Sequence, residues 1–200
     1  MPHKLLLATS NDGKIREIKA ILSPLRLEII TPTSLQLLMD VKETGHSYAE
    51  NARLKAEAYL SASGLPVLAD DSGLEVDILN GAPGINSARY SPKENANDLD
   101  RRLYLLKNLL GHPQPWKANF HCTAVLLTPE GYDLETTGQC TGVIIPEMRG
   151  SGGFGYDPIF YLPEYERTMA ELSPVLKNTL SHRSRALSAM IPSLKALFST

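Results

Sequence analysis

The segment Lys4-Leu5-Leu6-Leu7-Ala8-Thr9-Ser10-Asn11-Asp12-Gly13-Lys14 joins an apolar run to a polar turn near the start of the chain. A short apolar run that ends at turn residues is typical of a buried strand. Residues 13–22 then carry apolar side chains at helical spacing until Pro24, which predicts a helix. Residues 27–30 predict a second strand. This succession of strand, helix and strand indicates an α/β fold.

The remaining segments add further helices and a hairpin. A capping box at Ser47-Tyr48-Ala49-Glu50 begins a predicted helix that ends at Gly64. Further expected elements are strands at 66–69 and 74–79, a helix at 97–110 with Leu99, Leu103, Leu106 and Leu110 inward, a hairpin of strands 120–128 and 132–145, and a last helix after Ser181 that Pro192 kinks or restarts. Alternating units combined with a hairpin predict a mixed sheet.

Composition and charge exclude several classes of protein. The chain is 42% apolar, which is typical of a globular protein, and its net charge of −2 offers no basic field to polymeric nucleic acid. No apolar run is long enough to span a bilayer, and we interpret the Met1-Pro2-His3-Lys4 start as lacking a signal peptide. Cys122 and Cys140 cannot form a disulfide framework or a zinc motif, so we expect buried thiols in a reducing cytosol.

The turn Thr9-Ser10-Asn11-Asp12-Gly13-Lys14 lies between the first predicted strand and helix. The first N–H groups of a helix lack partners and its dipole is positive there, so such a turn can bind an anion. Lys14 would add a point charge. The turn is not a Walker A loop, because Ala8 and Ile15 replace its glycine and its Ser or Thr. The alternative is an ordinary capped turn.

Two adjacent carboxylates, Asp70 and Asp71, follow the predicted strand at 66–69. In a regular strand they would point to opposite faces, so we expect only one of them to face a pocket directly. Glu43 could add a further carboxylate. Oxygen ligands of this kind suit Mg²⁺, which is usually held by one or two carboxylates and substrate phosphates. The alternative is a solvated turn. On the next helix, Asn51 and Lys55 are four residues apart and share a face.

The loop Gly152-Gly153-Phe154-Gly155-Tyr156-Asp157-Pro158 combines aromatic residues with flexible glycines. Residues 150–155 match the dinucleotide pattern G-x-G-x-x-G, but Pro146 before and Pro158 after them exclude the strand and helix that it needs. We interpret the loop as one that exposes Phe154 and Tyr156 to a ligand, or else as a surface loop with a packed aromatic residue.

Two further groups invite a functional interpretation. Ser72 with His182 as its base would suggest a serine hydrolase, but the chain has no G-x-S-x-G elbow. Lys177, His182 and Arg183 form a cationic group at the start of the last helix. They could donate hydrogen bonds to a nucleotide base, or they could be a solvated surface.

Taken together, these residues resemble the inosine triphosphate pyrophosphatase family, the HAM1-like proteins. The resemblance covers nearly the whole chain in family order. The matching stretches are Thr9–Lys14, Glu43-Thr44-Gly45, Glu50–Ala56, Ala69–Leu74, Gly81-Ala82-Pro83-Gly84, Ser87-Ala88-Arg89-Tyr90, Gly152–Pro158 and Ser181-His182-Arg183.

The resemblance implies an elongated α/β fold with two lobes around a central cleft, one domain over residues 1–200, and a cytoplasmic homodimer. It implies Mg²⁺-dependent hydrolysis of ITP, dITP and XTP to the monophosphate and pyrophosphate, which removes these nucleotides from the pool. Thr9, Ser10, Asn11, Asp12, Gly13, Lys14 and Lys55 would hold the triphosphate, Glu43 and Asp71 the metal, and Phe154, Gly155, Tyr156, Asp157, Lys177, His182 and Arg183 the base and sugar. Asp71 would be the general base, and Ser72 would touch the substrate.

Two other functions remain open at this point. A nucleotide-binding sensor would need the cationic and aromatic residues but not the carboxylates. A triphosphatase that acts on other nucleotides, including the standard ones, would use the same machinery with a different base pocket. Asp71→Asn separates a sensor from an enzyme, because binding survives in both but only an enzyme loses turnover. A panel of nucleotide substrates with Mg²⁺, scored for pyrophosphate, tests the second alternative.

Overall fold

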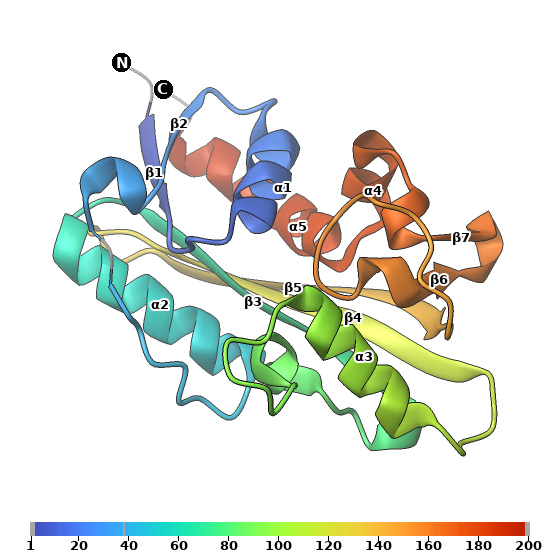
Figure 1. The fold of residues 1–200 in the computed structure, drawn as a ribbon. Helices are drawn as coiled ribbons and strands as arrows, with labels where there is room; N and C mark the ends of the chain where they lie inside the picture. Colours follow the sequence, from blue (N-terminus) through green and yellow to red (C-terminus); the bar gives the residue numbers. More distant parts are fainter. Residues whose placement is uncertain (1–2, 38, 199–200) are drawn as a thin grey trace. The chain divides into compact units, whose positions relative to one another are not determined.

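The computed structural model describes residues 3–37 and 39–198. Met1 and Pro2, on which the signal-peptide expectation partly rests, lie outside the described residues. The strands are β1 (His3–Leu7), β2 (Leu27–Ile30), β3 (Val67–Val76), β4 (Trp116–Leu127), β5 (Asp133–Ile144), β6 (Phe160–Leu162) and β7 (Arg167–Thr168), and the helices are α1 (Asp12–Leu22), α2 (Tyr48–Ser63), α3 (Asp98–Leu109), α4 (Pro174–Leu180) and α5 (His182–Phe198) (Figure 1). Short 3-10 turns span Thr33–Leu35, Asp77–Leu79, Gly84–Arg89, Asp157–Ile159, Pro163–Tyr165 and Met169–Glu171.

The strands form one sheet in the order β2-β1-β3-β4-β5-β6-β7. β1 is parallel to both β2 and β3, whereas β6 is antiparallel to β5 and β7. β4 and β5 are neighbours joined by a turn at residues 128–132, in which the Thr128 N–H donates to the Tyr132 carbonyl. The sheet is therefore mixed and flanked by helices, which confirms the predicted fold class.

The chain divides into two compact units that share the long strands. The first comprises the chain as far as Asp71, residues 122–138 and the chain from His182 onward, and the second comprises residues 72–121 and 139–181. Strands β3, β4 and β5 contribute residues to both units. The single domain with two lobes around a cleft stays a prediction.

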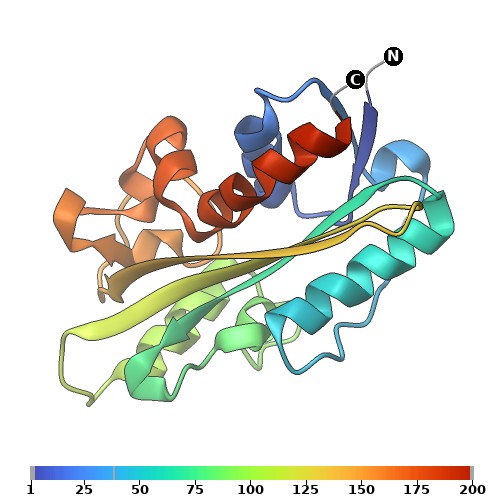
Figure 2. The same cartoon turned by 180° about the vertical axis from the view of Figure 1, so that it is seen from behind.

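In the first unit, helices cover both faces of the sheet, with α1 and α5 on one face and α2 on the other (Figures 1 and 2). Alternate strand residues supply the two cores. Leu5, Leu7 and Leu68 pack with α1 and α5, whereas Leu6 and Val67 pack with α2. Because side chains alternate along a strand, Asp70 continues the first series and Asp71 the second.

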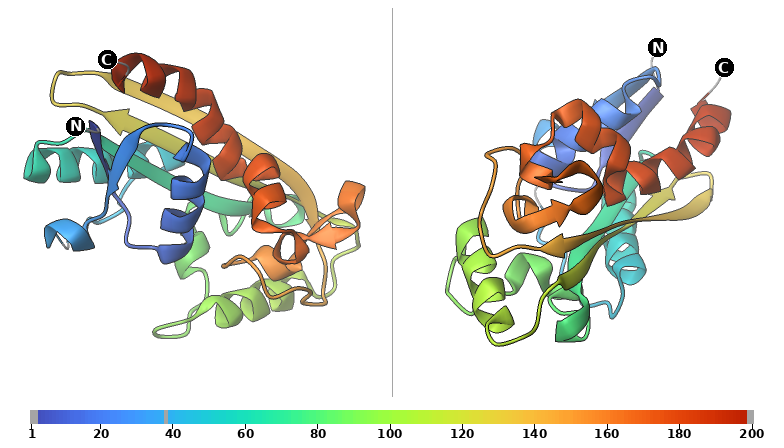
Figure 3. Two further views of the ribbon diagram at one scale, coloured as in Figure 1. Left: turned by 90° about the horizontal axis from the view of Figure 1, so that it is seen from above. Right: turned by 90° about the vertical axis from the view of Figure 1, so that its right-hand side faces the viewer.

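The second unit has its core around α3, β6 and the 3-10 turns of residues 157–171, which Figure 3 shows in green and orange. The predicted inward face of α3 is only partly correct, because Leu106 packs against this core but the other three predicted leucines do not. Leu105 and Leu109 are buried, whereas Leu99, Leu103 and Leu110 are 45%, 52% and 72% exposed. Leu105 and Leu109 instead pack in the core of this unit, and the arginines of the helix donate to the backbone carbonyl groups of Ala88 and Gly155.

The helix starts were predicted with partial success. Ser47 caps α2 by accepting from the Glu50 N–H, but the Glu50 carboxylate accepts from the His46 N–H, so the reciprocal half of the capping box lies one residue earlier. α2 ends at Gly64 with φ 63°, as expected. α5 continues through Pro192 without a break in its range.

Four other elements differ from the sequence-based expectation. β3 is one strand of ten residues, not two short strands. Helix α4 and the short strands β6 and β7 had no periodic pattern long enough to predict them.

Cys122 and Cys140 are buried free thiols, as predicted. In the described part of the chain, no helix has the combined length and apolar character that a membrane span requires.

Candidate functional site

The turn after β1 leads into the start of helix α1. Asn11 is the N-cap, and its side chain accepts from the Lys14 N–H over 3.0 Å. The Thr9 hydroxyl accepts from the Asn11 N–H over 3.2 Å. Ser10, Asn11 and Asp12 are exposed, whereas Gly13 is buried. The predicted anion site therefore has the helix start that it requires.

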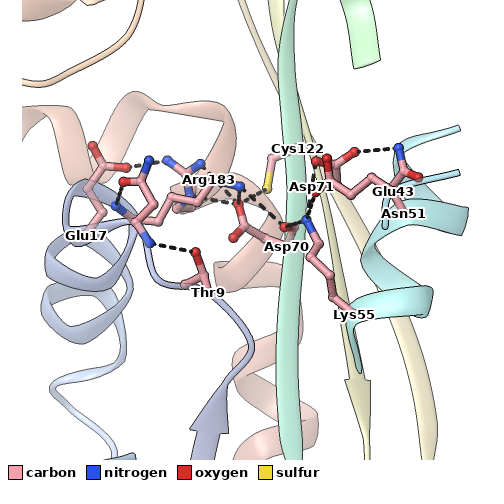
Figure 4. Close-up of polar contacts among 11 residues, drawn as sticks. Thr9, Glu17, Glu43, Asn51, Lys55, Asp70, Asp71, Cys122 and Arg183 are labelled. Carbon is pink, nitrogen blue, oxygen red and sulfur yellow. Dashed lines mark hydrogen bonds and ion pairs between the residues drawn. The ribbon is translucent and has the colours of Figure 1, made fainter. Parts of the chain in front are cut away.

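Lys14 reaches across to β3 and meets a buried carboxylate. Its Nζ lies 3.1 Å from Oδ2 of Asp70. The same Oδ2 accepts from Nε and Nη2 of Arg183, each over 3.1 Å, and Arg183 Nη1 donates to Glu17 over 2.5 Å (Figure 4). Asp70 and Arg183 are each 1% exposed. The face of β3 that packs with α1 and α5 thus carries an ion-pair network.

The charges of this network keep Asp70 ionised. Burial alone would raise the pKa of Asp70, but Lys14, Arg183 and Lys55 together hold it well below its ordinary value. The pKa of Arg183 is raised because Asp70 and Glu17 outweigh the effect of burial. Nearby, burial raises the pKa of the Cys122 thiol to about 12, so this cysteine is neutral.

Asp71 lies on the opposite face of β3, toward α2, as strand alternation predicts (Figure 4). Its Oδ2 accepts from Nδ2 of Asn51 over 3.3 Å, and its Oδ1 lies 3.5 Å from Nζ of Lys55. The same Lys55 ammonium is 2.7 Å from Oε1 of Glu43 and donates to the Asp70 carbonyl over 2.9 Å. Two carboxylates from distant parts of the sequence therefore converge on one cation.

The environment of Asp71 makes its carboxylate more basic than usual. Burial raises the pKa of Asp71, Lys55 and Lys14 oppose this, and Glu43 and Asp70 add to the increase. For Lys55, burial would lower the pKa, but Asp71, Asp70 and Glu43 raise it above its ordinary value. A raised carboxylate pKa suits a general base, because the group holds a proton more readily than an ordinary aspartate.

The donor set fits a magnesium ion. Glu43 and Asp71 are already close enough to share the Lys55 ammonium, and Mg²⁺ is usually held by one or two carboxylates with phosphate oxygens and water as the other ligands. Among the described residues, no cluster of three or more His, Cys, Asp or Glu side chains forms a protein-only metal site. The pair therefore fits a metal that a substrate would help to hold.

The second unit contains the other predicted group, the loop around Phe154. The Phe154 N–H donates to Oδ2 of Asp157 over 2.8 Å, and Lys177 pairs with the same oxygen. Nζ of Lys177 lies 5.1 Å from the centre of the Phe154 ring. A Cβ atom on Gly153 would be 2.0 Å from the Asp157 carboxylate, so a glycine is required for this approach. The structure thus brings Phe154, Asp157 and Lys177 together.

Tyr156 is turned inward, contrary to the prediction that the loop exposes it. It is 5% exposed, and its hydroxyl donates to the Ser87 carbonyl over 2.9 Å. Burial raises the pKa of this phenol well above its ordinary value. Tyr156 therefore anchors the loop to the 3-10 turn at residues 84–89.

The remaining predicted residues are divided between the two units. Ser72 belongs to the second unit, whereas His182 begins α5 in the first. Lys177 lies on α4 in the second unit and Arg183 on α5 in the first. The base-binding roles of Lys177, His182 and Arg183 stay predictions, and the structure adds a role for Arg183 as the partner of Asp70 and Glu17.

Sequence reasoning placed Asn51 beside Lys55 but gave it no role, and it missed Glu17, Asp98 and Arg102. Asn51 could have been found, since its position four residues before Lys55 directs both side chains toward one target. Glu17 follows Lys14 by three residues on α1 and could have been suspected as a partner of a cation. Asp98 and Arg102 gave no local signal, because they act on a loop more than 50 residues away.

Comparisons with known proteins agree on one family. The model of the Ham1 family matches residues 5–193. The dITP/XTP pyrophosphatase of Desulforamulus reducens is 43% identical over 98% of this chain and 97% of its own length, and that of Thermus thermophilus is 46% identical over 96% and 92%. A solved HAM1 protein from Coxiella burnetii superposes with a TM-score of 0.87 at 40% identity, over 97% of this chain and 99% of that one.

Proposed function

The chain belongs to the Ham1 family, and we propose that it hydrolyses dITP, ITP and XTP to the nucleoside monophosphate and pyrophosphate. The relatives named dITP/XTP pyrophosphatase support this substrate class. The observation that carries the proposal is the convergence of Glu43 and Asp71 on Lys55, which shares the Asp70 carbonyl with Lys14 of the helix start. This set can neutralise a triphosphate and activate water, and a hydrolase acting on a phosphoanhydride bond requires both.

In this proposal the triphosphate binds the N–H groups at the start of α1 and the ammonium groups of Lys14 and Lys55. Glu43 and Asp71 would hold Mg²⁺, which supplies charge neutralisation for the phosphate oxygens. Asp71 accepts a proton from the attacking water as the bond to the pyrophosphate leaving group breaks. Asn51 keeps the Asp71 carboxylate in place through its hydrogen bond of 3.3 Å.

The base would bind to the loop of the second unit. Phe154 offers a ring for stacking, and Lys177 is a pure donor that suits the six-oxo group of hypoxanthine and xanthine. Adenine carries an amine at that position and would offer the Lys177 ammonium no acceptor. His182 and Arg183 are proposed to complete the base and sugar site, and Ser72 to touch the substrate.

We further propose that the protein acts as a homodimer on the nucleotide pool of the cytoplasm. Nucleoside triphosphates are small substrates present in that pool, and the net charge of −2 gives no attraction for a polymeric nucleic acid. Light scattering of the purified protein measures the mass directly, and a mass close to that of one 21.9 kDa chain would contradict the dimer.

The substrate proposal predicts strong discrimination by the base. We expect kcat/KM for dITP and XTP to exceed that for dATP at least about tenfold, because each buried donor left unpaired costs about 1–3 kcal/mol. Pyrophosphate release is measured for a panel of nucleotides with Mg²⁺, and with EDTA as the metal-free control. Equal turnover of dATP would support the alternative of a less selective triphosphatase.

A second prediction concerns the stacking ring. Replacing Phe154 with alanine is expected to raise KM for dITP about tenfold while kcat changes less than about threefold, since base–aromatic stacking contributes about 1–3 kcal/mol. Tyr165→Ala serves as the matched control, because Tyr165 is an exposed aromatic residue of the same unit. A folded Phe154→Ala variant with an unchanged KM would mean that the ring only packs against its own loop.

A further inference from the structure

Helix α3 holds the backbone of Gly155 on both sides. The Gly155 N–H donates to Oδ2 of Asp98 over 2.7 Å, and the Gly155 carbonyl accepts from Nη1 of Arg102 over 2.6 Å. Asp98 and Arg102 are four residues apart, so they lie on the same face of the helix. A single turn of α3 therefore satisfies both polar backbone groups of one loop residue.

Both contacts involve charged side chains. Burial would raise the pKa of Asp98, but hydrogen bonds from the Arg101 side chain and the Gly155 N–H hold it below its ordinary value. The carboxylate is therefore ionised at neutral pH. Hydrogen bonds to ionised groups are shorter and stronger than those between neutral groups, and the two distances at Gly155 agree with this.

The loop needs these contacts because its own backbone is permissive. Gly153 and Gly155 flank Phe154 with φ values of 69° and 59°, which are conformations that glycine adopts freely and other residues rarely adopt. Asp157 accepts a hydrogen bond from the Phe154 N–H. Asp98 and Arg102 hold the backbone of the next residue, Gly155.

We propose that Asp98 and Arg102 are positioning residues that set the place of the Phe154 ring for the purine base. The inference rests on the proposed function, since it assigns the ring to the base of a nucleotide. Neither side chain needs to touch the nucleotide, because both act through the backbone of Gly155. Their loss is therefore expected to weaken base binding and to leave the hydrolytic step almost unchanged.

The test compares four variants by steady-state kinetics with dITP. Asp98→Ala and Arg102→Met are expected to raise KM about tenfold, which is about 1.4 kcal/mol, with kcat within about threefold of the wild type. Asp98→Asn keeps an acceptor for the Gly155 N–H and should recover part of the loss. Asp100→Ala is the matched control, since it removes the capping box of the same helix without touching Gly155.

Two measurements that do not depend on turnover separate this inference from the proposed function. Hydrogen exchange of residues 152–158 should accelerate in Asp98→Ala but not in Asp100→Ala, and calorimetry should show a dIMP affinity about tenfold weaker. Suppose that the wild type binds dIMP but does not hydrolyse dITP, while Asp98→Ala and Asp100→Ala still differ in exchange and in dIMP affinity as stated. The inference then survives and the proposed function fails. Wild-type exchange and affinity in Asp98→Ala, or equal losses in Asp100→Ala, overturn the inference.

Discussion

Replacing Asp71 with asparagine is expected to lower the turnover of dITP at least about 100-fold, the lower end of the usual contribution of a general base. Asparagine keeps the shape of the side chain and can still contact Asn51 and Lys55. It loses the proton acceptor and the negative charge that would help hold a metal. Because burial makes Asp71 more basic than an ordinary aspartate, the wild-type group is well suited to accept the proton of a water molecule.

The variant also separates an enzyme from a nucleotide sensor. dITP binding should survive the substitution under either function, whereas only an enzyme loses turnover. Asp133→Asn is the matched control, since it changes a carboxylate of the first unit that lies at the surface and pairs with Arg53. Near-normal turnover of Asp71→Asn would remove Asp71 from the catalytic role and direct attention to Asp70 or Glu43.

The position of the attack is measured by hydrolysis in ¹⁸O-water. Attack on the α- or the β-phosphorus gives the same two products, so the products alone do not distinguish them. Resemblance to the family favours the α-phosphorus, which places the label in the monophosphate. Label confined to pyrophosphate would contradict this and would require a different orientation of the triphosphate against Lys14 and Lys55.

Local sequence signals predicted the parts of the fold that depend on local chemistry. The apolar run before Thr9, the cap at Ser47 and the glycine at residue 64 each act within a few residues, and each appears in the structure as predicted. The opposite directions of Asp70 and Asp71 followed from the geometry of a strand. The buried face of α3 was not predictable in this way, because Leu105 and Leu109 pack with residues distant in the sequence, such as Phe160.

The same distinction applies to the candidate site. The resemblance and the residue types selected Glu43, Lys55 and Asp71 correctly as a group that the structure brings together. The sequence could not reveal that Arg183 is buried against Asp70 and Glu17, because these three residues lie on α5, β3 and α1 and meet only in the folded chain. Its cationic neighbours suggested a surface, whereas the fold buries it almost completely.

Replacing Arg183 with methionine is expected to destabilise the fold by about 3–5 kcal/mol, because it leaves Asp70 and Glu17 without the guanidinium that joins them. Methionine retains much of the apolar volume, so the loss reports charge and hydrogen bonding rather than a cavity. Arg53→Met is the control, since Arg53 forms a surface pair with Asp133 that contributes at most about 1 kcal/mol. Urea unfolding of both variants measures the free energies.

The acid sensitivity of the wild type gives an independent test of this network. The pKa of Asp70 is held well below that of an unfolded aspartate, about 3.9, so its contribution to stability is fully present above that pH and declines as the pH falls below it. Asp70→Asn lowers the stability at neutral pH because it removes the charge opposite Arg183. It should also flatten the decline below about pH 4, because asparagine does not titrate there. An acid profile of Asp70→Asn parallel to that of the wild type would mean that other carboxylates control acid unfolding and that Asp70 is not the main acid-sensitive group.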